Sequence, residues 1–237
     1  MITKRIRYIL CRMLLFVFLA ASPGLAASAD SIRLEQADGS TLMLDAPAQS
    51  LVTLSPHLTE LVFAAGAGEL IKATVEFSEF PDAAANIPRI GDAFRLDIER
   101  IVSLRPELVI AWGSGNPTAA IKQLQSMGIP VWSVEILEPG QIPQIIESIG
   151  HATNRQQTAF EAAQNFRTRL AELIDRYRNE ETLEFFYQVD ARPLFTINGE
   201  HPISRGLSLC RGRNIFEEEQ GLAFQVAHES VMLADPD

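Results

Sequence analysis

Residues 77–116 read FSEFPDAAANIPRIGDAFRLDIERIVSLRPELVIAWGSGN, and this segment places one short helix, one apolar strand and two loops in a fixed order. Asp97 begins the predicted helix, where a carboxylate is favourable near the positive end of the helix dipole, and Arg105-Pro106 ends it. Leu108–Trp112 then reads as a strand buried on both faces, and Gly113–Pro117 forms an open turn at its carboxyl end. Parallel α/β sheets bind ligands at the carboxyl ends of their strands, so this segment predicts one wall of a ligand-binding cleft.

Strand and helix patterns alternate on both sides of this segment. Residues 32–44 alternate apolar and polar side chains around Asp38-Gly39, which predicts a hairpin. Apolar runs predict strands at 51–54, 70–75, 108–112 and 131–134, and helical patterns fall at 58–67, 97–104, 118–127 and 142–149. Because this alternation is typical of a parallel α/β sheet, we expect an N-terminal α/β lobe over residues 30–153.

A long helical pattern comes next. In residues 154–179, apolar side chains recur every three or four positions, and no Gly or Pro interrupts them. At 1.5 Å per residue such a helix would span roughly 40 Å, which is enough to run beside two lobes. An ordinary surface helix would have the same pattern. Its position between two α/β regions favours a bridging helix, which we place at 154–181.

A second α/β region, residues 182–237, repeats part of the first. Its predicted elements are strands at 183–189 and 194–197, a helix near 203–209 and a short strand at 214–216. At the same spacing, Glu99, Ile101, Leu104, Pro106 and Glu107 are echoed by Glu229, Val231, Ala234, Pro236 and Asp237. A buried strand follows the first copy at once, whereas the sequence stops after the second. We therefore predict two Rossmann-like lobes bridged by one long α-helix, with the second lobe incomplete.

The N-terminus has the pattern of a cleavable export signal, residues 1–29. Four basic residues precede the apolar run Met13–Ala21, and Ala27-Ser28-Ala29 offers a small-residue cleavage site. The run is too short to span a membrane and Cys11 lies before it, so we expect a soluble periplasmic protein without a lipid anchor. Cleavage would leave 16 basic and 30 acidic residues, a net charge of −14 that disfavours nucleic acid as a partner.

Several segments, taken in order, resemble the periplasmic cobalamin-binding proteins of ABC importers, a branch of the metal-chelate receptors. They are LVTLSPHLTELVFAAGAGELI from Leu51, the segment 77–116, LFTINGEHPISRGLSLC from Leu194, GRNIF from Gly212 and VAHESVMLADPD from Val226. The resemblance covers most of the chain after the leader. It implies two lobes joined by a long helix, non-covalent binding of cobalamin with no cofactor, delivery to a permease in the inner membrane, and no catalysis.

Aromatic residues gather at predicted strand ends and loops, where they suit a large flat ligand such as a corrin ring. We expect the cleft to be lined by Phe77, Phe80, Phe94 and Trp112 in the first lobe and by Phe195 and Phe224 in the second. For any single phenylalanine, core packing is the alternative. Trp112 is the strongest candidate, because it ends a buried strand beside a glycine-rich turn.

The sequence also departs from the cobalamin binders that it resembles. Phe77 stands where the family has a tyrosine, and Ala93-Phe94 stands where some members have a tryptophan, so the pocket keeps its aromatic character with fewer polar anchors. The resemblance implies a cysteine partner for Cys210 beyond the last residue of this sequence. From the residues alone, a lone cysteine is by default a small buried apolar side chain.

Two glutamates and one histidine complete the candidate residues. The resemblance implies that Glu99 and Glu229, each at the start of a short helix, meet permease arginines. Stabilisation of a helix N-terminus is the alternative. His57 lies at a helix start facing the expected cleft, where it either contacts ligand or makes a local hydrogen bond. The other histidines lack metal-ligand spacing, so we assign no metal site.

Catalytic motifs are absent from the sequence: it has no GxSxG elbow, no Walker lysine and no CxxC. The leading hypothesis is therefore a solute-binding protein that delivers cobalamin or a related corrinoid. One alternative keeps the fold and changes the cargo to a ferric siderophore or haem. Another is a small exported enzyme that uses the turn at 113–117 on a phosphorylated substrate, and a third is a non-functional remnant.

Overall fold

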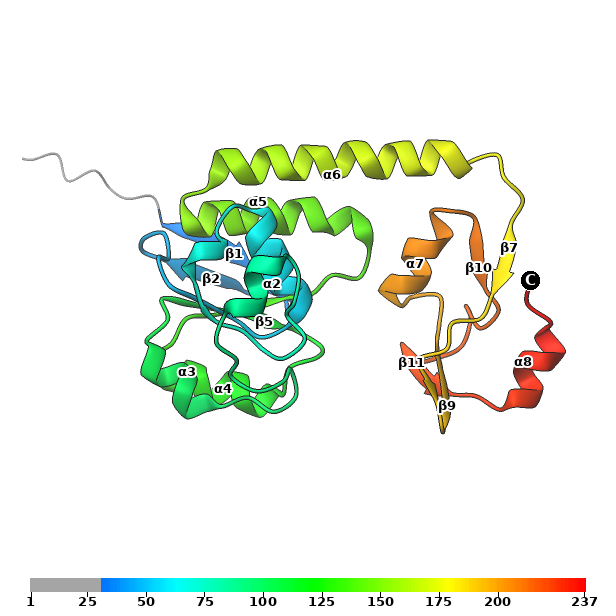
Figure 1. The fold of residues 1–237 in the computed structure, drawn as a ribbon, viewed down its shortest axis with the longest axis horizontal. Coiled ribbons are helices and arrows are strands. Elements are labelled where there is room, and N and C mark those ends of the chain that lie inside the picture. Colours follow the sequence, from blue (N-terminus) through cyan, green and yellow to red (C-terminus); the bar gives the residue numbers. More distant parts are fainter. Residues whose placement is uncertain (1–30) are drawn as a thin grey trace, which may run out of the picture. The chain divides into compact units, whose positions relative to one another are not determined.

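The computed structural model describes residues 31–237, and the predicted export signal lies outside the described residues. The chain forms a mixed α/β fold (Figure 1). Its largest sheet has four strands in the order β4-β3-β5-β6, with every neighbouring pair parallel. The strands are β3 (Leu51–Thr53), β4 (Ile71–Ala73), β5 (Leu108–Trp112) and β6 (Val131–Val134). The α/β fold with a parallel sheet is thus as predicted.

Strand β5 lies in the middle of this sheet and is buried on both faces. Leu108 and Ile110 belong to one apolar cluster, and Val109 and Ala111 belong to another. Successive side chains of a strand point to opposite faces, so the two clusters are the two sides of the sheet. An uninterrupted apolar run is the signature of such a strand, and the predicted bounds agree with the observed ones.

Helices cover both faces of the sheet. They are α2 (Pro56–Ala64), α3 (Ile98–Leu104), α4 (Thr118–Ser126) and α5 (Ile142–Thr153), with short 3₁₀ turns η1 (Gly68–Leu70), η2 (Asp82–Asn86) and η3 (Pro139–Gln141). Leu58 of α2 and Ile149 of α5 pack in the first cluster. Ile101 of α3 and Leu124 of α4 pack in the second. Each helix therefore covers the face that its apolar residues select.

The predicted hairpin is present, as β1 (Ile32–Glu35) paired antiparallel with β2 (Thr41–Leu44). It is tied to the edge strand β6. The indole Nε1 of Trp132 donates to the carbonyl of Glu35 at 2.8 Å, and the amide of Ala37 donates to the carbonyl of Ser133 at 2.8 Å. The hairpin thus shields part of an exposed sheet edge.

The long helix α6 (Gln156–Tyr177) has 22 residues, about 33 Å by helix geometry and shorter than predicted. It packs along α5. A Cβ on Gly150 would lie 2.3 Å from Cβ of Ala159, so the two helices approach closely there. Nη1 and Nη2 of Arg167 donate to the Glu147 carboxylate, at 2.6 and 2.9 Å. Across residues 31–237, no helix is long and apolar enough to cross a membrane.

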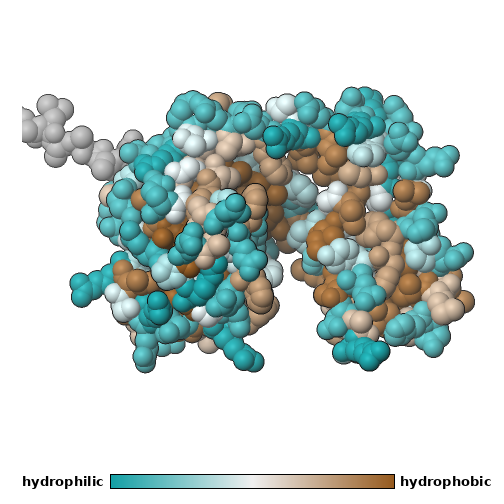
Figure 2. Space-filling model, viewed as in Figure 1, coloured by the Kyte–Doolittle hydropathy of each residue, from teal (hydrophilic) through white to brown (hydrophobic). Residues whose placement is uncertain are grey.

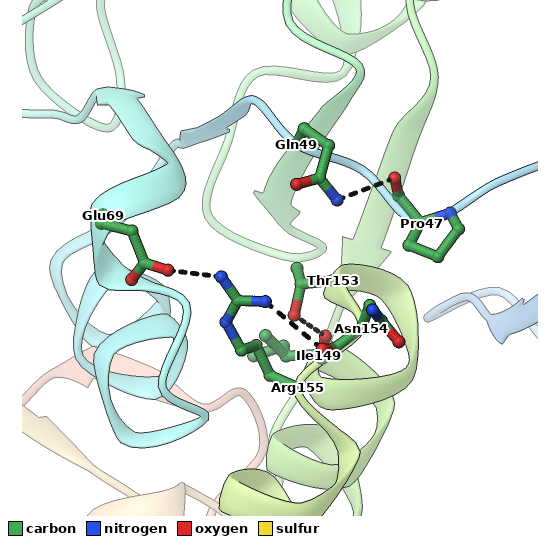
Figure 3. Close-up of polar contacts among 7 residues, drawn as sticks. All are labelled: Pro47, Gln49, Glu69, Ile149, Thr153, Asn154 and Arg155. Carbon is green, nitrogen blue, oxygen red and sulfur yellow. Dashed lines mark hydrogen bonds and ion pairs between the residues drawn. The ribbon is translucent and has the colours of Figure 1, made fainter.

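An exposed ion pair marks the junction of α5 and α6 (Figure 3). Asn154 ends α5 in the left-handed conformation, with φ 57°. Next to it, Nη2 of Arg155 donates to Oε1 of Glu69 at 2.6 Å, and Nη1 of Arg155 donates to the Asn154 carbonyl at 3.3 Å. A solvent-exposed pair of this kind contributes about 0–1 kcal/mol, so it adds little to the stability of the fold.

The elements after α6 form two smaller sheets. They are β7 (Leu183–Phe185), β8 (Asp190–Ala191), β9 (Leu194–Ile197), α7 (Pro202–Ser208), β10 (Gly212–Asn214), β11 (Ala223–Gln225) and α8 (His228–Ala234). Strand β7 pairs parallel with β10, whereas β9 pairs antiparallel with β8 and β11. Buried Asn214 donates to the Ile197 carbonyl at 2.8 Å and to Oγ of Ser204 at 2.9 Å.

The internal repeat extends to backbone geometry. Helices α3 and α8 each have seven residues, and each ends in a left-handed residue, Arg105 at φ 47° and Asp235 at φ 46°. The amide of Glu107 then donates to the Ser50 carbonyl at 3.0 Å, and the amide of Asp237 donates to the Glu184 carbonyl at 3.0 Å. In both copies, a seven-residue helix thus ends in a left-handed residue, and the chain after it donates a backbone hydrogen bond to a residue in or next to a parallel strand.

Apolar surface is exposed among the elements before α6 and among those after it (Figure 2). In the C-terminal part, the most exposed large apolar side chains are Met232 at 78% and Leu233 at 87%, both in α8. Cys210, which follows α7, is half-buried rather than fully buried as its default interpretation predicts. It is a free thiol among the described residues.

Candidate functional site

The carboxyl ends of β3, β4 and β5 lie at one edge of the parallel sheet. The candidate residues at the ends of these strands or in the segments after them form what we call the aromatic edge: His57, Phe77, Phe80, Phe94 and Trp112. His57 is the second residue of α2, and Trp112 is the last residue of β5. Parallel sheets place their ligand sites at this edge, as the sequence predicts.

Three phenylalanines of the aromatic edge are exposed to solvent. The exposed fraction is 78% for Phe77, 67% for Phe80 and 65% for Phe94. Phe77 also has φ 66°, in the left-handed region that bulky residues seldom adopt. Exposed rings grouped on loops, with one of them in a strained conformation, are typical of a binding surface rather than of core packing.

A buried hydroxyl cluster lies beneath the Phe77 loop. Thr74 Oγ1 is 2.9 Å from Thr53 Oγ1, 2.7 Å from Thr59 Oγ1 and 2.9 Å from Ser78 Oγ. All four side chains are buried, and each has hydrogen-bond partners. Such a network is strong in a low-dielectric interior. It anchors Ser78, and with it the backbone that carries Phe77.

Arg89 also holds this loop. Its Nη2 donates to the Ser78 carbonyl at 2.8 Å, and its Nη1 donates to the carbonyls of Ala84 and Ile87 at 3.0 and 2.8 Å. The guanidinium is planar and carries five donors, so one side chain fixes three carbonyl groups in a defined geometry.

The Phe94 loop has its own anchors. Oδ1 of Asp92 accepts from the amides of Phe94 and Arg95, both at 2.8 Å. The amide of Glu76 donates to the Gly91 carbonyl at 2.8 Å, which joins this loop to the Phe77 loop. Gly91 has φ 96°, and a Cβ there would lie 2.0 Å from the Arg95 carbonyl oxygen, so only glycine fits.

Trp112 is half-buried and fixed by polar contacts. Its backbone amide donates to Oδ1 of Asn116 at 2.6 Å, and its indole Nε1 donates to Oε1 of Glu135 at 3.2 Å. The His57 ring meets the indole edge to face, with the ring centroids 5.4 Å apart and the planes at 89°. Of the candidate residues, His57 and Trp112 are thus in direct contact.

Burial favours the neutral form of the His57 ring. Burial lowers the pKa of His57 below its usual value of 6.5, and the Glu135 carboxylate offsets part of that shift. Its Nε2 lies 3.4 Å from Oγ of Ser55, which is the local hydrogen bond predicted as the alternative to a ligand contact. Within residues 31–237, no group of His, Cys, Asp and Glu side chains could hold a metal ion.

Phe195 and Phe224 do not share one face of their sheet. Phe195 lies opposite Gln225 in the β9–β11 pair, and Phe224 lies opposite Thr196. Residues opposite each other share a face and neighbours alternate, so the two phenylalanines point to opposite sides. Phe224 packs against Phe216, with ring centroids 6.0 Å apart. Only one of the two can face a given ligand.

Glu99 and Glu229 occupy equivalent places in the repeat. Each lies in the first turn of its seven-residue helix, α3 or α8, and each is exposed. Neither carboxylate takes part in a hydrogen bond or ion pair with other residues in the described part of the chain. Both are therefore available to an external partner.

Sequence reasoning missed the residues that support the aromatic edge: Arg89, Asn116, Glu135 and the hydroxyl cluster Thr53, Thr59, Thr74 and Ser78. Their signal is weak, because a single polar residue after a strand is common in loops. Thr53 and Thr74 carry a detectable hint, since each is a polar residue next to a buried apolar run.

Residues 51–237 match the family described as "Periplasmic binding protein". A vitamin B12-binding protein of Vibrio cholerae is 33% identical over 190 residues, which is 80% of this chain and 69% of that protein. One from Yersinia pestis is 34% identical over 197 residues, 82% of this chain and 70% of that protein.

Solved structures agree with these matches. The periplasmic vitamin B12-binding protein BtuF of Vibrio cholerae superposes with a TM-score of 0.76 at 33% identity, over 80% of this chain and 74% of that one. The haem-binding protein HutB of Vibrio cholerae has a TM-score of 0.66 at 22% identity, over 79% and 74%, and shows the fold alone. These relatives are binding proteins and not enzymes. The chain belongs to the periplasmic binding protein family.

Proposed function

We propose that this protein binds cobalamin or a related corrinoid in the periplasm and delivers it to the permease of an ABC importer. The observation that carries the proposal is the aromatic edge, which contains three exposed phenylalanines and Trp112, in a chain 33% identical to vitamin B12-binding proteins over 80% of its length. A corrin ring has broad apolar faces fringed by amides. Rigid rings cover such faces with little loss of side-chain entropy.

The anchors of the aromatic edge support tight binding of a rigid ligand. Arg89, the hydroxyl cluster and Asp92 fix the loops that carry Phe77 and Phe94 before any ligand arrives. A surface that is already ordered loses less conformational freedom on binding, which favours affinity. Phe195 or Phe224 would supply a further aromatic contact, from whichever face of their sheet meets the ligand.

The experiment that tests the ligand class is a competitive titration of the full chain. Cyanocobalamin, haemin and a ferric hydroxamate siderophore would each be titrated while tryptophan fluorescence and calorimetric heat are recorded. We expect the corrinoid to bind most tightly and to displace the other two. Tighter binding of haemin or the siderophore would show that cobalamin is not the preferred ligand, and it would leave the assignment to the periplasmic binding protein family unchanged.

Haem is the second candidate because haem-binding proteins share the fold, as HutB does. The described residues argue against a strong iron ligand at the aromatic edge. His57 could offer one nitrogen, but its Nε2 is near Ser55 and its ring packs on Trp112. The ring-stacking surface is therefore better developed than any metal-binding set.

For delivery, we propose that Glu99 and Glu229 orient the loaded protein on its permease. Their equivalent positions on α3 and α8 support this role, as do their exposed carboxylates. A peripheral ion pair contributes about 0–1 kcal/mol, so these groups would affect orientation and association rate more than affinity. The rest of the net acidity would favour solubility and steer encounter with a basic partner.

Charge reversal tests the docking proposal. Glu99→Lys and Glu229→Lys, alone and together, should slow association with the reconstituted permease and leave corrinoid affinity unchanged. Glu172→Lys, on the exposed face of α6, is the matched control. Equal slowing by all three changes would show a general charge effect and not two docking points.

Export is tested separately, by N-terminal sequencing of the periplasmic form, which we expect to begin at Asp30.

A further inference from the structure

We propose that Glu135 and the turn Gly113–Asn116 position the Trp112 indole for the ligand, an inference that rests on the proposed function of the aromatic edge. Glu135 directly follows β6, which is the neighbour of β5 in the sheet. Its Oε1 accepts from the indole Nε1 of Trp112 at 3.2 Å, and its Oε2 accepts from the amide of Ser114 at 2.6 Å. One carboxylate thus binds both the ring and the turn that follows it.

The two glycines of this turn are required by space. A Cβ on Gly115 would lie 1.9 Å from the indole atom Cε3 of Trp112, so the ring rests directly on the backbone of Gly115. A Cβ on Gly113 would lie 2.9 Å from Cβ of Ala37 and 3.0 Å from Oε2 of Glu135. The glycines therefore make room for the indole and for the carboxylate that holds it.

The same contacts argue against a phosphate-binding loop at residues 113–117. A phosphate loop needs free backbone amides that converge on an anion. Here the Ser114 amide is already donated to Glu135, and a carboxylate beside the turn would repel a second anion. The glycine-rich turn is thus explained by the tryptophan that it supports.

Asn116 is the second anchor, and it acts on the backbone. Its Oδ1 accepts from the Trp112 amide at 2.6 Å, and its Nδ2 donates to the carbonyls of Leu54 and Ala93 at 2.9 and 2.8 Å. With 5% of its surface exposed, this side chain joins the ends of β3 and β5 to the Phe94 loop. Asn116 therefore fixes the backbone of Trp112, and Glu135 fixes the orientation of its indole ring.

His57 closes the arrangement by packing its ring at 89° to the indole. Trp112 is then held by a carboxylate at Nε1, by the backbone of Gly115 on one face, and by the imidazole of His57. A ring fixed in this way is already oriented before ligand arrives. It therefore loses little conformational entropy on binding, which favours affinity. Glu135 and Asn116 are positioning residues, because they act through Trp112.

The test uses Glu135→Ala and Glu135→Gln in the full chain, with Glu172→Ala on α6 as the control of equal charge change. The readout is the pair of indole N–H resonances in a ¹H–¹⁵N spectrum. Trp132 is the internal reference, because it is the other tryptophan and its Nε1 donates to the Glu35 carbonyl in the core. A Trp112→Phe variant assigns the two resonances.

We expect Glu135→Ala to shift the Trp112 indole resonance, to speed its exchange with water and to lower corrinoid affinity about tenfold. Glu135→Gln keeps one acceptor oxygen, enough for the indole N–H or the Ser114 amide but not for the two together, so all three effects should be smaller than in Glu135→Ala. The Trp132 resonance and the control should not change. An unshifted Trp112 resonance in Glu135→Ala, or an equal loss of affinity in Glu172→Ala, would overturn the positioning role.

Two further measurements keep the outcomes separate. Gly115→Ala should displace the same resonance, whereas Gly140→Ala, where a Cβ has open space, should not. If Glu135→Ala does not fold, Glu135→Gln and Gly115→Ala decide the question. If the wild-type protein binds no corrinoid, the proposed function fails, and the resonance shifts still show whether Glu135 holds the indole.

Discussion

At the scale of single residues, the exposed rings depend on polar side chains that never reach the ligand surface. Arg89 binds three loop carbonyls, and Asn116 binds two carbonyls and one amide. Hydrogen bonds of a charged group contribute about 1.5–3 kcal/mol, more than a neutral pair. Such residues set the shape of a binding surface whose visible part is apolar.

Arg89→Lys should therefore destabilise the protein although it keeps the positive charge. A lysine ammonium cannot reach the carbonyls of Ser78, Ala84 and Ile87 in the same planar geometry. We expect the free energy of unfolding in urea to fall by about 1–3 kcal/mol. Arg100→Lys, on the exposed surface of α3, is the control and should change it by less than about 0.5 kcal/mol. Equal effects of the two substitutions would refute the anchor role.

His57 makes stability depend on pH. Because burial lowers the pKa of His57 in the folded state, the unfolded chain binds a proton more readily below pH 6.5. Its contribution is complete above pH 6.5 and is lost as the pH falls through the lower folded-state pKa. His57→Gln removes this dependence. Urea unfolding of both proteins between pH 5 and 7.5 should show a difference that shrinks on acidification, and a constant difference would contradict the assignment.

At the scale of elements, periodicity predicted most of what is observed. The bounds of β5 and β6 agree with the sequence, since an apolar run between turn residues has few alternatives. The sequence repeat that contains Glu99 and Glu229 predicted two short helices, and both have seven residues and a left-handed C-cap. Strand β11 and the two-residue β8 were not predicted, because antiparallel pairs this short have almost no period to detect.

The supporting contacts could not be predicted for a different reason. Glu135 meets Trp112 across 23 positions of sequence, and Asn116 meets Leu54 across 62. Such pairs depend on strand order, which a single sequence does not reveal. The opposite faces of Phe195 and Phe224 follow from the β9–β11 register, which is likewise set by pairing.

Packing of α5 on α6 offers a prediction at this scale. Gly150→Ala raises helix propensity, but its Cβ would lie 2.3 Å from Cβ of Ala159. Overpacking of this kind costs about 1–3 kcal/mol, which exceeds the gain of about 1 kcal/mol from propensity. We therefore expect a lower melting temperature for Gly150→Ala. Gly140→Ala, with no neighbour within 4 Å, should leave it nearly unchanged. A stabilised Gly150→Ala would show that the helices separate without cost.

At the scale of the whole molecule, the chain combines an acidic surface with exposed aromatic loops. The formal net charge is −10, and the three exposed phenylalanines of the aromatic edge are on loops and not on regular elements. The first property suits encounter with a basic partner, and the second suits a flat apolar ligand. The family and the α/β fold were predictable from segment order, whereas the division into lobes at 30–153, 154–181 and 182–237 stays a prediction.

The central claim is that the aromatic edge binds a corrinoid, and isothermal titration of the full chain with cyanocobalamin tests it most directly. Phe77→Ala combined with Phe94→Ala removes two exposed rings, whereas Phe160→Ala removes an equally apolar ring that is 51% exposed on α6. We predict that the wild-type protein and Phe160→Ala bind alike and that the double variant loses at least about tenfold in affinity. Unchanged affinity in the double variant, or no heat with the wild-type protein, would contradict the account.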